Sequence, residues 1–281
     1  MTEKDAPAPS PGAEPKSDPA QQPRQEPDDT VAFGFRRVRP EEKASLVSDH
    51  FDRVASTYDL GNTLLSLGIH HLWKRVAVRM TGIREGDKVL DVCGGTGDLA
   101  LLAAKRVGTS GRVVLYDFNR RMMEKGVPKI TRSPWGGSIS LVQGDAERIA
   151  GREGAFDAAM VGFGVRNLTR MEQGFREMHR VLRPGGRLMC LEFSRPTSAW
   201  FRALYDAYSF SLMPVLSRLI VGTRNPYSYL AESIRLFPSP DELSALLRGI
   251  GFRDVAYRRL TNGIAAVHLA VKPGEETQEE S

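Results

Sequence analysis

The stretch VLDVCGGTGDLA, residues 89–100, joins an apolar run that carries one aspartate to a glycine-rich turn and then to a helix-like segment. Such a turn between a strand and a helix lets a ligand approach the backbone closely and presents free N–H groups to it. Residues 95–100 fit the G-x-G-x-x-G/A dinucleotide pattern, which is a weak signal by itself. The stretch therefore predicts the first strand, turn and helix of a Rossmann-like α/β fold.

The chain after Gly86 alternates between strand-like and amphipathic segments. This order predicts a mostly parallel sheet with helices on both faces. Two final strand-like runs are joined by the turn signal Thr261-Asn262-Gly263, which fits an antiparallel C-terminal hairpin. The expected strands lie near residues 88–93, 112–117, 139–143, 156–162, 187–193, 252–260 and 265–272.

Composition limits the class of protein. The chain has 281 residues, of which 41% are hydrophobic, enough for one large α/β domain. Its net charge is +5, but no dense basic run appears, so we do not expect nucleic acid as a partner. Its two cysteines lie in apolar segments, which fits a reducing compartment without a disulfide or zinc site. With neither a secretion signal nor a membrane-spanning run, we expect a cytoplasmic protein without a bound metal.

The N-terminal region divides into a tail and a helical segment. Seven prolines stand among polar residues before Thr30, so we expect residues 1–40 to form a disordered tail. The ordered domain is expected to span residues 41–273. Val47, Phe51, Val54 and Tyr58 then recur at helical spacing. A second helix is expected to start at Asn62, so that residues 41–85 form a helical lid. Residues 274–281 form a short acidic tail.

Three acidic residues follow three successive predicted strands. Asp117 ends the second strand 20 residues after Gly97, where a carboxylate can accept hydrogen bonds from both hydroxyls of a ribose. Asp91 ends the first strand and suits a cationic amino group better than a pyrophosphate, which favours S-adenosylmethionine over a dinucleotide. Asp145 and Ala146 end the third strand, where an adenine amino group and ring face would lie. Each aspartate alone is equally well explained as a turn or helix cap.

Five stretches of the sequence are specific enough to indicate a family: YDLGNTLLSLGIHHLW (58–73), GGTGD (94–98), FGVRN (163–167), RVLRPGGRLMCLEFS (180–194) and YSYLAESI (227–234). The chain resembles the ubiquinone/menaquinone biosynthesis C-methyltransferases (UbiE/MenG type), class I S-adenosylmethionine-dependent enzymes, over residues 42–273. The family's usual Met in the first stretch is Gly61 here, and its usual Ser before Phe163-Gly164 is Gly162, so no hydroxyl role is carried over to that position.

The resemblance implies methyl transfer from S-adenosylmethionine to a ring carbon of a prenylated quinol, either demethylmenaquinol or 2-methoxy-6-polyprenyl-1,4-benzoquinol. Because a phenol has a pKa near 10, the reaction needs a base or a cationic partner for the phenolate. We assign these roles to Arg166, His70 and Tyr58; a structural salt bridge for Arg166 and a packed helix face for His70 stay open. The expected cofactor-binding residues are Asp91, Gly94, Gly95, Thr96, Gly97, Asp117, Asp145 and Ala146.

An aromatic and apolar segment follows the fifth strand. Residues 199–222 carry charges and a proline, so they cannot span a bilayer. Within residues 195–240 they can roof the active site for a polyprenyl chain, pack as ordinary core, or rest transiently on the membrane as a peripheral contact. A homodimer stays open. The alternative functions are methylation of another lipid or small molecule, or dinucleotide binding by a Rossmann protein.

Overall fold

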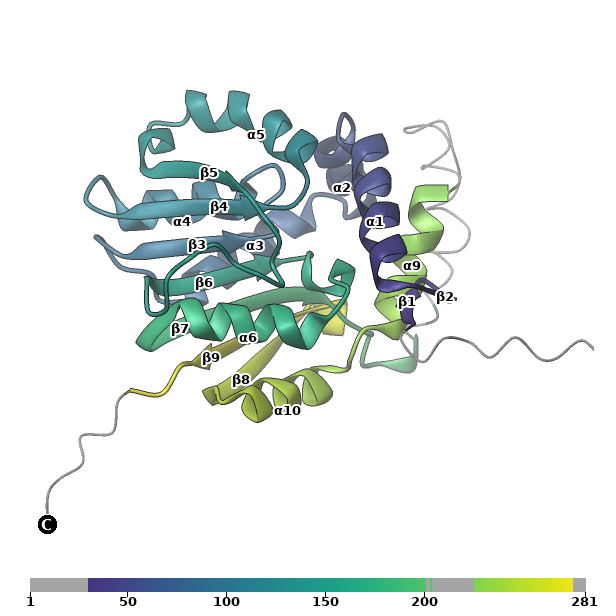
Figure 1. Cartoon of the computed structure of the whole chain (residues 1–281). Coiled ribbons are helices and arrows are strands. Elements are labelled where there is room, and N and C mark those ends of the chain that lie inside the picture. Colours follow the sequence, from purple (N-terminus) through teal and green to yellow (C-terminus); the bar gives the residue numbers. More distant parts are fainter. Residues whose placement is uncertain (1–29, 201–202, 204–224, 275–281) are drawn as a thin grey trace, which may run out of the picture.

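The computed structural model describes residues 30–200, 203 and 225–274, and its centre is a seven-stranded sheet (Figure 1). The strand order is β5-β4-β3-β6-β7-β9-β8. The first five strands in this order run parallel, and β9 pairs antiparallel with both β7 and β8. The predicted mixed sheet with its C-terminal hairpin is confirmed. The strands are β3 (Lys88–Val92), β4 (Arg112–Asp117), β5 (Ile139–Gln143), β6 (Phe156–Gly162), β7 (Leu182–Phe193), β8 (Arg253–Leu260) and β9 (Ala265–Val271).

Helices cover both faces of this sheet, as predicted. On one face, α3 (Ile69–Met80), α4 (Asp98–Val107) and α5 (Arg120–Arg132) pack into a core that includes Val89. On the other face, α6 (Met171–Val181) and α10 (Pro240–Ile250) pack into a second core that includes Leu90. Successive residues of β3 therefore serve opposite faces, as the period of a strand requires.

The start of β7 differs from the predicted strand. The pairing with β6 passes from Phe156 opposite Leu182 directly to Ala158 opposite Arg187, so the residues between them form a bulge. Gly185 adopts a φ of 71° in this bulge, and its N–H donates to the carbonyl of Lys272 at 2.9 Å. The Pro184-Gly185-Gly186 sequence thus acts as a turn after α6, and it also ties β7 to the end of β9.

The N-terminal helices differ from the prediction at one junction. They are α1 (Pro40–Val54), α2 (Tyr58–Leu65) and α3. The prediction that a helix starts at Asn62 is wrong, because Asn62 lies inside α2. The chain breaks between α2 and α3 instead, where Leu67 and Gly68 have φ values of 49° and 74°.

The tail predicted over residues 1–40 ends earlier than expected. Residues 31–38 form an antiparallel hairpin of β1 (Val31–Phe33) and β2 (Arg36–Val38), which lies beside α9 (Asn225–Leu236) in Figure 1. The N–H of Phe35 donates to Glu232 Oε2 at 3.0 Å, and the Phe33 ring stacks on Tyr229 with centroids 4.4 Å apart. This packing on a distant helix orders strands of three residues, which are too short to be stable alone.

Parts of the predicted tails and roof lie outside the described residues, namely residues 1–29, 201–202, 204–224 and 275–281, and these include most of the apolar 199–222 segment. Among the described residues, no helix is both long and apolar enough to cross a membrane.

Candidate active site

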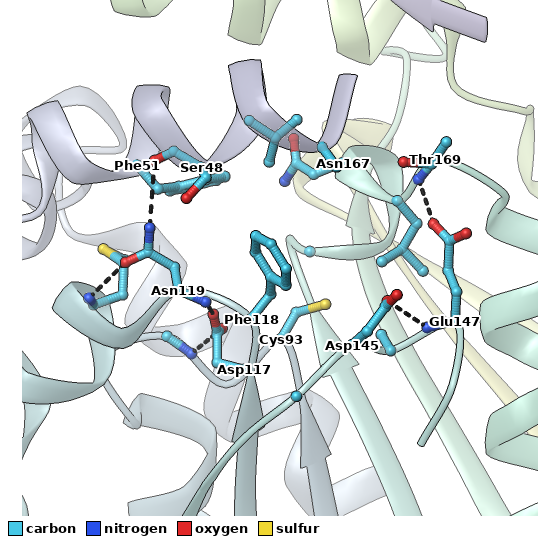
Figure 2. Close-up of a pocket in the computed structure, with 18 of the residues that line it drawn as sticks. Ser48, Phe51, Cys93, Asp117, Phe118, Asn119, Asp145, Glu147, Asn167 and Thr169 are labelled. Atoms are coloured by element: carbon cyan, nitrogen blue, oxygen red, sulfur yellow. Dashed lines mark hydrogen bonds between the residues drawn. The ribbon is translucent and has the colours of Figure 1, made fainter. Parts of the chain in front are cut away.

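A cavity of about 280 Å³ lies where the parallel strands end, under helix α1 (Figure 2). Carboxyl ends of neighbouring parallel strands meet at one edge of a sheet, which is where open α/β folds bind their ligands. Segments after β3, β4, β5 and β6 form the floor and walls. Helix α1 contributes Pro40, Glu41, Ala44, Val47, Ser48 and Phe51, and the sheet edge contributes, among others, Cys93, Gly95, Asp117, Phe118, Asn119, Met122, Asp145, Ala146, Glu147, Phe163, Gly164, Asn167 and Thr169.

The glycine-rich turn owes its path to close packing. A Cβ added to Gly94 would lie 2.7 Å from Leu115 Cγ and 3.1 Å from Asp91 Oδ2, so only glycine fits there. Gly95 and Gly97 have φ values of 54° and 86°, which glycine adopts without strain. Gly95 lines the cavity, whereas Gly94 and Gly97 support the turn from behind.

Asp117 lies at the end of β4 and lines the cavity, as predicted. Its Oδ2 accepts a hydrogen bond from the N–H of Gly95 at 2.8 Å, and its Oδ1 accepts one from the N–H of Asn119 at 2.7 Å. Burial raises the pKa of this carboxyl, and the two N–H groups oppose that rise. Asp117 therefore joins the glycine-rich turn to the start of α5 and still faces the cavity.

The third predicted acid, Asp145, lines the cavity beside the buried Ala146. Its Oδ1 accepts the N–H of Glu147 at 2.8 Å. Glu147, which the sequence did not single out, accepts the N–H group of Thr169 at 2.6 Å (Figure 2). It also accepts the N–H group of Arg170 at 2.9 Å. It fixes the loop after β6 against the loop after β5.

Asp91 is completely buried directly beneath the turn, outside the cavity lining itself. Neither of its carboxylate oxygens has a hydrogen-bond partner among the residues that the structure describes. Burial raises the pKa of Asp91 to about 8, and the nearby Asp117 adds to the rise. A buried carboxyl without a partner is costly, and a cationic group bound beside it would remove that cost.

Thr96 is not a lining residue of the cavity, and its side chain belongs to a network of charged groups. Its hydroxyl donates to Asp59 Oδ1 at 2.7 Å and accepts from Lys129 Nζ at 3.0 Å. Lys129 and Lys74 both pair with Asp98, and although burial alone would raise the pKa of the Asp98 carboxyl, the two ammonium groups hold it below its usual range. The network ties the glycine-rich turn to α2 and α5.

The two predicted catalytic residues on the N-terminal helices, Tyr58 and His70, differ in their relation to the cavity. Tyr58 lines the cavity, whereas His70 is absent from the described lining residues. His70 is buried, with Nε2 3.2 Å from Thr63 Oγ1, and its pKa is lowered to about 4, first by burial and then by Lys74. At neutral pH its imidazole is therefore uncharged.

His70, His71 and Asp98 place possible metal-ligand atoms within 4.8 Å of one another. Both carboxylate oxygens of Asp98 already accept hydrogen bonds from the ammonium groups of Lys74 and Lys129. Because these two positive charges would repel a cation, we assign no metal to this cluster.

Arg166 forms a buried ion pair. Its Nη1 lies 2.7 Å from Glu192 Oε1 and also donates to the Phe163 carbonyl, and the guanidinium stands 5.3 Å from the centroid of the Phe193 ring. Its Nε is buried without a hydrogen-bond partner in the described part of the chain. The side chain is 92% buried and is not among the described residues that line the cavity, so the structure shows the salt bridge and leaves the buried Nε without a partner.

The sequence departure at Gly162 has a packing cause. A Cβ at this position would lie 2.5 Å from Leu99 Cδ1, so the leucine of α4 occupies the space that a larger residue would need. Gly162 lines the cavity together with the neighbouring Phe163, Gly164 and Asn167.

The sequence reasoning missed the residues of α1 and those directly after Asp117. One face of the helix is formed by residues spaced three, one and three apart, namely Ala44, Val47, Ser48 and Phe51. This spacing predicts the face but not what the face covers. Phe118 and Asn119 follow the predicted strand end, and Phe118 remains half exposed within the cavity. Position after a strand end was the signal that could have found them.

The glycine-rich turn, the uncompensated Asp91 and the cavity-lining Asp117 fit an adenosyl ligand with a cationic amino group. Fold and site together define a class I S-adenosylmethionine-dependent methyltransferase, and the methyl donor is S-adenosylmethionine. A family model described as "ubiE/COQ5 methyltransferase family" matches residues 36–272. The chain belongs to the ubiE/COQ5 methyltransferase family and is a C-methyltransferase, so the resemblance seen in the sequence is confirmed.

Individual proteins agree with this assignment. The chain is 44% identical over 246 residues to the ubiquinone/menaquinone biosynthesis C-methyltransferase UbiE of Pseudomonas paraeruginosa, covering 88% of this chain and 96% of that one. The UbiE of Azotobacter vinelandii is likewise 44% identical, with 88% and 97% covered. Among solved structures, a SAM-dependent methyltransferase from Thermotoga maritima superposes with a TM-score of 0.56 at 16% identity, covering 80% of this chain and 99% of that one, which supports the fold alone.

Proposed function

We propose that the enzyme methylates a ring carbon of a prenylated quinol, converting demethylmenaquinol, 2-methoxy-6-polyprenyl-1,4-benzoquinol or both. The names of the 44% identical relatives support an acceptor from ubiquinone or menaquinone biosynthesis. The observation that carries the proposal is the buried Arg166, which lies one residue before the cavity-lining Asn167 and whose Nε lacks a partner among the described residues; Arg166 itself is not a lining residue. Such a donor suits an acceptor that develops negative charge on oxygen.

The cofactor half of the cavity follows from the acids and the glycine-rich turn. We assign Asp91 to the cationic amino group of S-adenosylmethionine, Asp117 to its ribose hydroxyls, and Asp145 with Ala146 to its adenine. Gly94, Gly95, Thr96 and Gly97 shape the backbone beside it. When bound, S-adenosylmethionine supplies an electrophilic methyl group on a sulfonium.

The acceptor half must make a ring carbon nucleophilic. A quinol carbon becomes strongly nucleophilic when the neighbouring hydroxyl loses its proton, and a phenol with a pKa near 10 keeps that proton at neutral pH unless the phenolate is stabilised. Arg166 Nε is the donor that we assign to this oxygen. Tyr58, which lines the cavity, is placed to orient the ring or pass on its proton. A proton relay through the buried His70 stays a prediction.

We further propose that residues 199–222 touch the membrane surface, where prenylated quinols reside. At the described edge of this segment, Trp200 is 70% exposed, which supports an apolar contact. Co-sedimentation with anionic liposomes tests this contact: Trp200→Ala should reduce binding, and unchanged binding would refute the role of Trp200. A homodimer also stays a prediction, which analytical ultracentrifugation decides.

The acceptor is tested with labelled S-adenosylmethionine and short-chain demethylated naphthoquinone and benzoquinone acceptors, with and without dithionite. Because the cationic methyl group needs an electron-rich carbon, product should form from the reduced rings and hardly at all from the oxidised ones. Equal rates on both redox forms would refute the mechanism. Activity on unrelated lipids or small molecules, without activity on either quinol, would refute the proposed acceptor.

A further inference from the structure

Tyr229 of α9 lies at the junction of three distant segments of the chain. Its ring stacks on Phe33 of the N-terminal hairpin, with centroids 4.4 Å apart and planes inclined by 22°. The His50 ring of α1 lies 5.2 Å away on a tilted plane. The Tyr229 side chain is therefore buried and held by aromatic contacts from two other elements.

The hydroxyl of Tyr229 reaches the cavity wall through Asn167. It donates a hydrogen bond to Asn167 Oδ1 at 3.0 Å. Burial raises the pKa of Tyr229 to about 12, so the hydroxyl keeps its proton at neutral pH and remains a donor. The same burial effect lowers the pKa of His50 to about 4, which leaves a neutral ring beside it.

This contact determines which end of the Asn167 amide is available to a ligand. An amide side chain offers one acceptor oxygen and one NH₂ group with two donors. Tyr229 occupies the oxygen, and Asn167 lines the cavity beside Phe163 and Gly164 (Figure 2). The group of Asn167 left for a bound molecule is its Nδ2 donor. Asn167 directly follows Arg166 in the sequence, and the Nε of Arg166 is buried without a partner among the described residues.

We propose that Tyr229 is a positioning residue that fixes the Asn167 amide so that Nδ2 donates to an oxygen of the acceptor ring. Asn167 thereby selects acceptors that carry a hydroxyl or oxyanion, and this inference rests on the proposed quinol acceptor. Without the tyrosine hydroxyl, the amide could turn over and present Oδ1 to the cavity. Asn167 Oδ1 would then face the oxygen of the acceptor ring, and the repulsion between these two electron-rich atoms disfavours a bound phenolate.

The test begins with Tyr229→Phe, which keeps the ring and removes only the hydroxyl. The substrate is a short-chain demethylmenaquinol held reduced by dithionite. Loss of one neutral hydrogen bond should lower kcat/KM for the quinol about three- to tenfold. The dissociation constant of S-adenosylmethionine, measured by calorimetry, should change less than about twofold, because the cofactor half does not touch Tyr229. The matched control is Tyr257→Phe on strand β8, which removes a hydroxyl that donates a hydrogen bond to Asp241 of α10 and should leave both values unchanged.

A double-mutant cycle shows whether Tyr229 acts through Asn167. In an Asn167→Ala background, adding Tyr229→Phe should change kcat/KM by less than about twofold, since the amide to be oriented is gone. Independent, multiplying effects of the two substitutions would overturn the proposal. So would a Tyr229→Phe enzyme with wild-type kcat/KM, or one that loses cofactor affinity in parallel.

The acceptor of the enzyme and the positioning role of Tyr229 are tested by different results. If the wild-type enzyme does not methylate the reduced ring, the proposed acceptor is wrong. If the wild-type enzyme does so and the cycle shows no coupling, only the positioning role of Tyr229 is wrong. Thermal unfolding of each variant, with a midpoint equal to that of the wild type, excludes misfolding as the cause of a loss.

Discussion

The side-chain amide of Asn119 donates a hydrogen bond to Asp52 Oδ1 at 2.8 Å, and so joins the start of α5 to α1 beside the cavity. The same Nδ2 lies 3.3 Å from the Ser48 carbonyl. Near the other end of the helix, Lys43 Nζ donates to the Leu168 carbonyl at 2.7 Å. Helix α1 is therefore fixed on both sides of the cavity that it covers.

Loosening either tie should speed cofactor release. Lys43→Met keeps most of the aliphatic stem and removes the charged donor, and we expect the dissociation constant of S-adenosylmethionine to rise about three- to tenfold, mainly through a faster off-rate. Stopped-flow displacement measures this rate. Asp49→Ala, at an exposed position on the same helix, is the control. Equal off-rates in both variants and the wild type would show that α1 does not retain the cofactor.

Cofactor affinity should depend on pH through Asp91. With a pKa of about 8, this carboxyl is mostly protonated at neutral pH in the ligand-free protein. The cationic amino group favours the ionised form, so binding releases a proton and tightens as pH rises from about 6 to about 7.5, by up to about tenfold per unit. Calorimetry in buffers of different ionisation enthalpy detects the proton. Asp91→Asn should bind weakly and without this dependence, whereas Asp157→Asn, at the amino end of β6, should retain it.

The same carboxyl should make the ligand-free protein less stable as pH rises. Between its ordinary value near 3.8 and about 8, the folded protein holds a proton on Asp91 that the unfolded chain has lost. The contribution of Asp91 to the free energy of unfolding therefore falls across this range. Urea unfolding measures this effect. From about pH 5 to about pH 8, the free energy of unfolding of Asp91→Asn should rise steadily relative to that of the wild type. A constant difference would contradict the burial argument.

Arg166 should matter for turnover more than for cofactor binding. Arg166→Lys keeps a charge near Glu192 but loses the planar Nε donor, and we expect kcat to fall about 10²-fold or more with little change in cofactor affinity. Arg166→Ala is a poorer test, because an unpaired buried Glu192 would cost about 3–5 kcal/mol of stability. Arg183→Lys, whose partner Asp157 lies at the opposite end of the sheet, is the control. Unaltered turnover in Arg166→Lys would refute the oxyanion role.

Two truncations separate the tail from the hairpin. Residues 1–29 are rich in proline and polar side chains and offer no apolar face for packing, so their removal should leave the melting temperature and turnover nearly unchanged. Removing residues 1–38 also deletes Phe33 and its stack on Tyr229, and should lower turnover with the quinol. Differential scanning calorimetry and the methyl-transfer assay compare the two chains. Identical behaviour would show that the hairpin is dispensable.

The sequence predicted the elements whose signals are local. The strands β3, β4, β5 and β6 begin and end within a residue of the expected positions, because each is an apolar run bounded by glycine or polar residues. The break at Leu67 was missed, since a leucine in a left-handed conformation has no sequence signature. The hairpin at 31–38 was missed because its order depends on contacts with α9, far along the chain.

Among the site residues too, those with a local sequence signal could be predicted, and those that depend on distant segments could not. Asp117 and Asp145 could be placed because strand ends of a parallel sheet converge. Thr96 could not be, since its partners Asp59 and Lys129 come from other helices. The ion pair of Arg166 likewise depends on Glu192, which reads in the sequence as part of a buried strand.

The hairpin's place on α9 also bears on when the enzyme becomes complete during synthesis. Phe35 and Glu232 are 197 residues apart, so this contact cannot form until most of the chain has left the ribosome. The strands β3 and β4, with the glycine-rich turn between them, are neighbours in sequence and can pair early. The glycine-rich turn can therefore take its shape before the N-terminal hairpin packs on α9, so the part of the cavity that we assign to the methyl donor can form earlier than the wall around Tyr229.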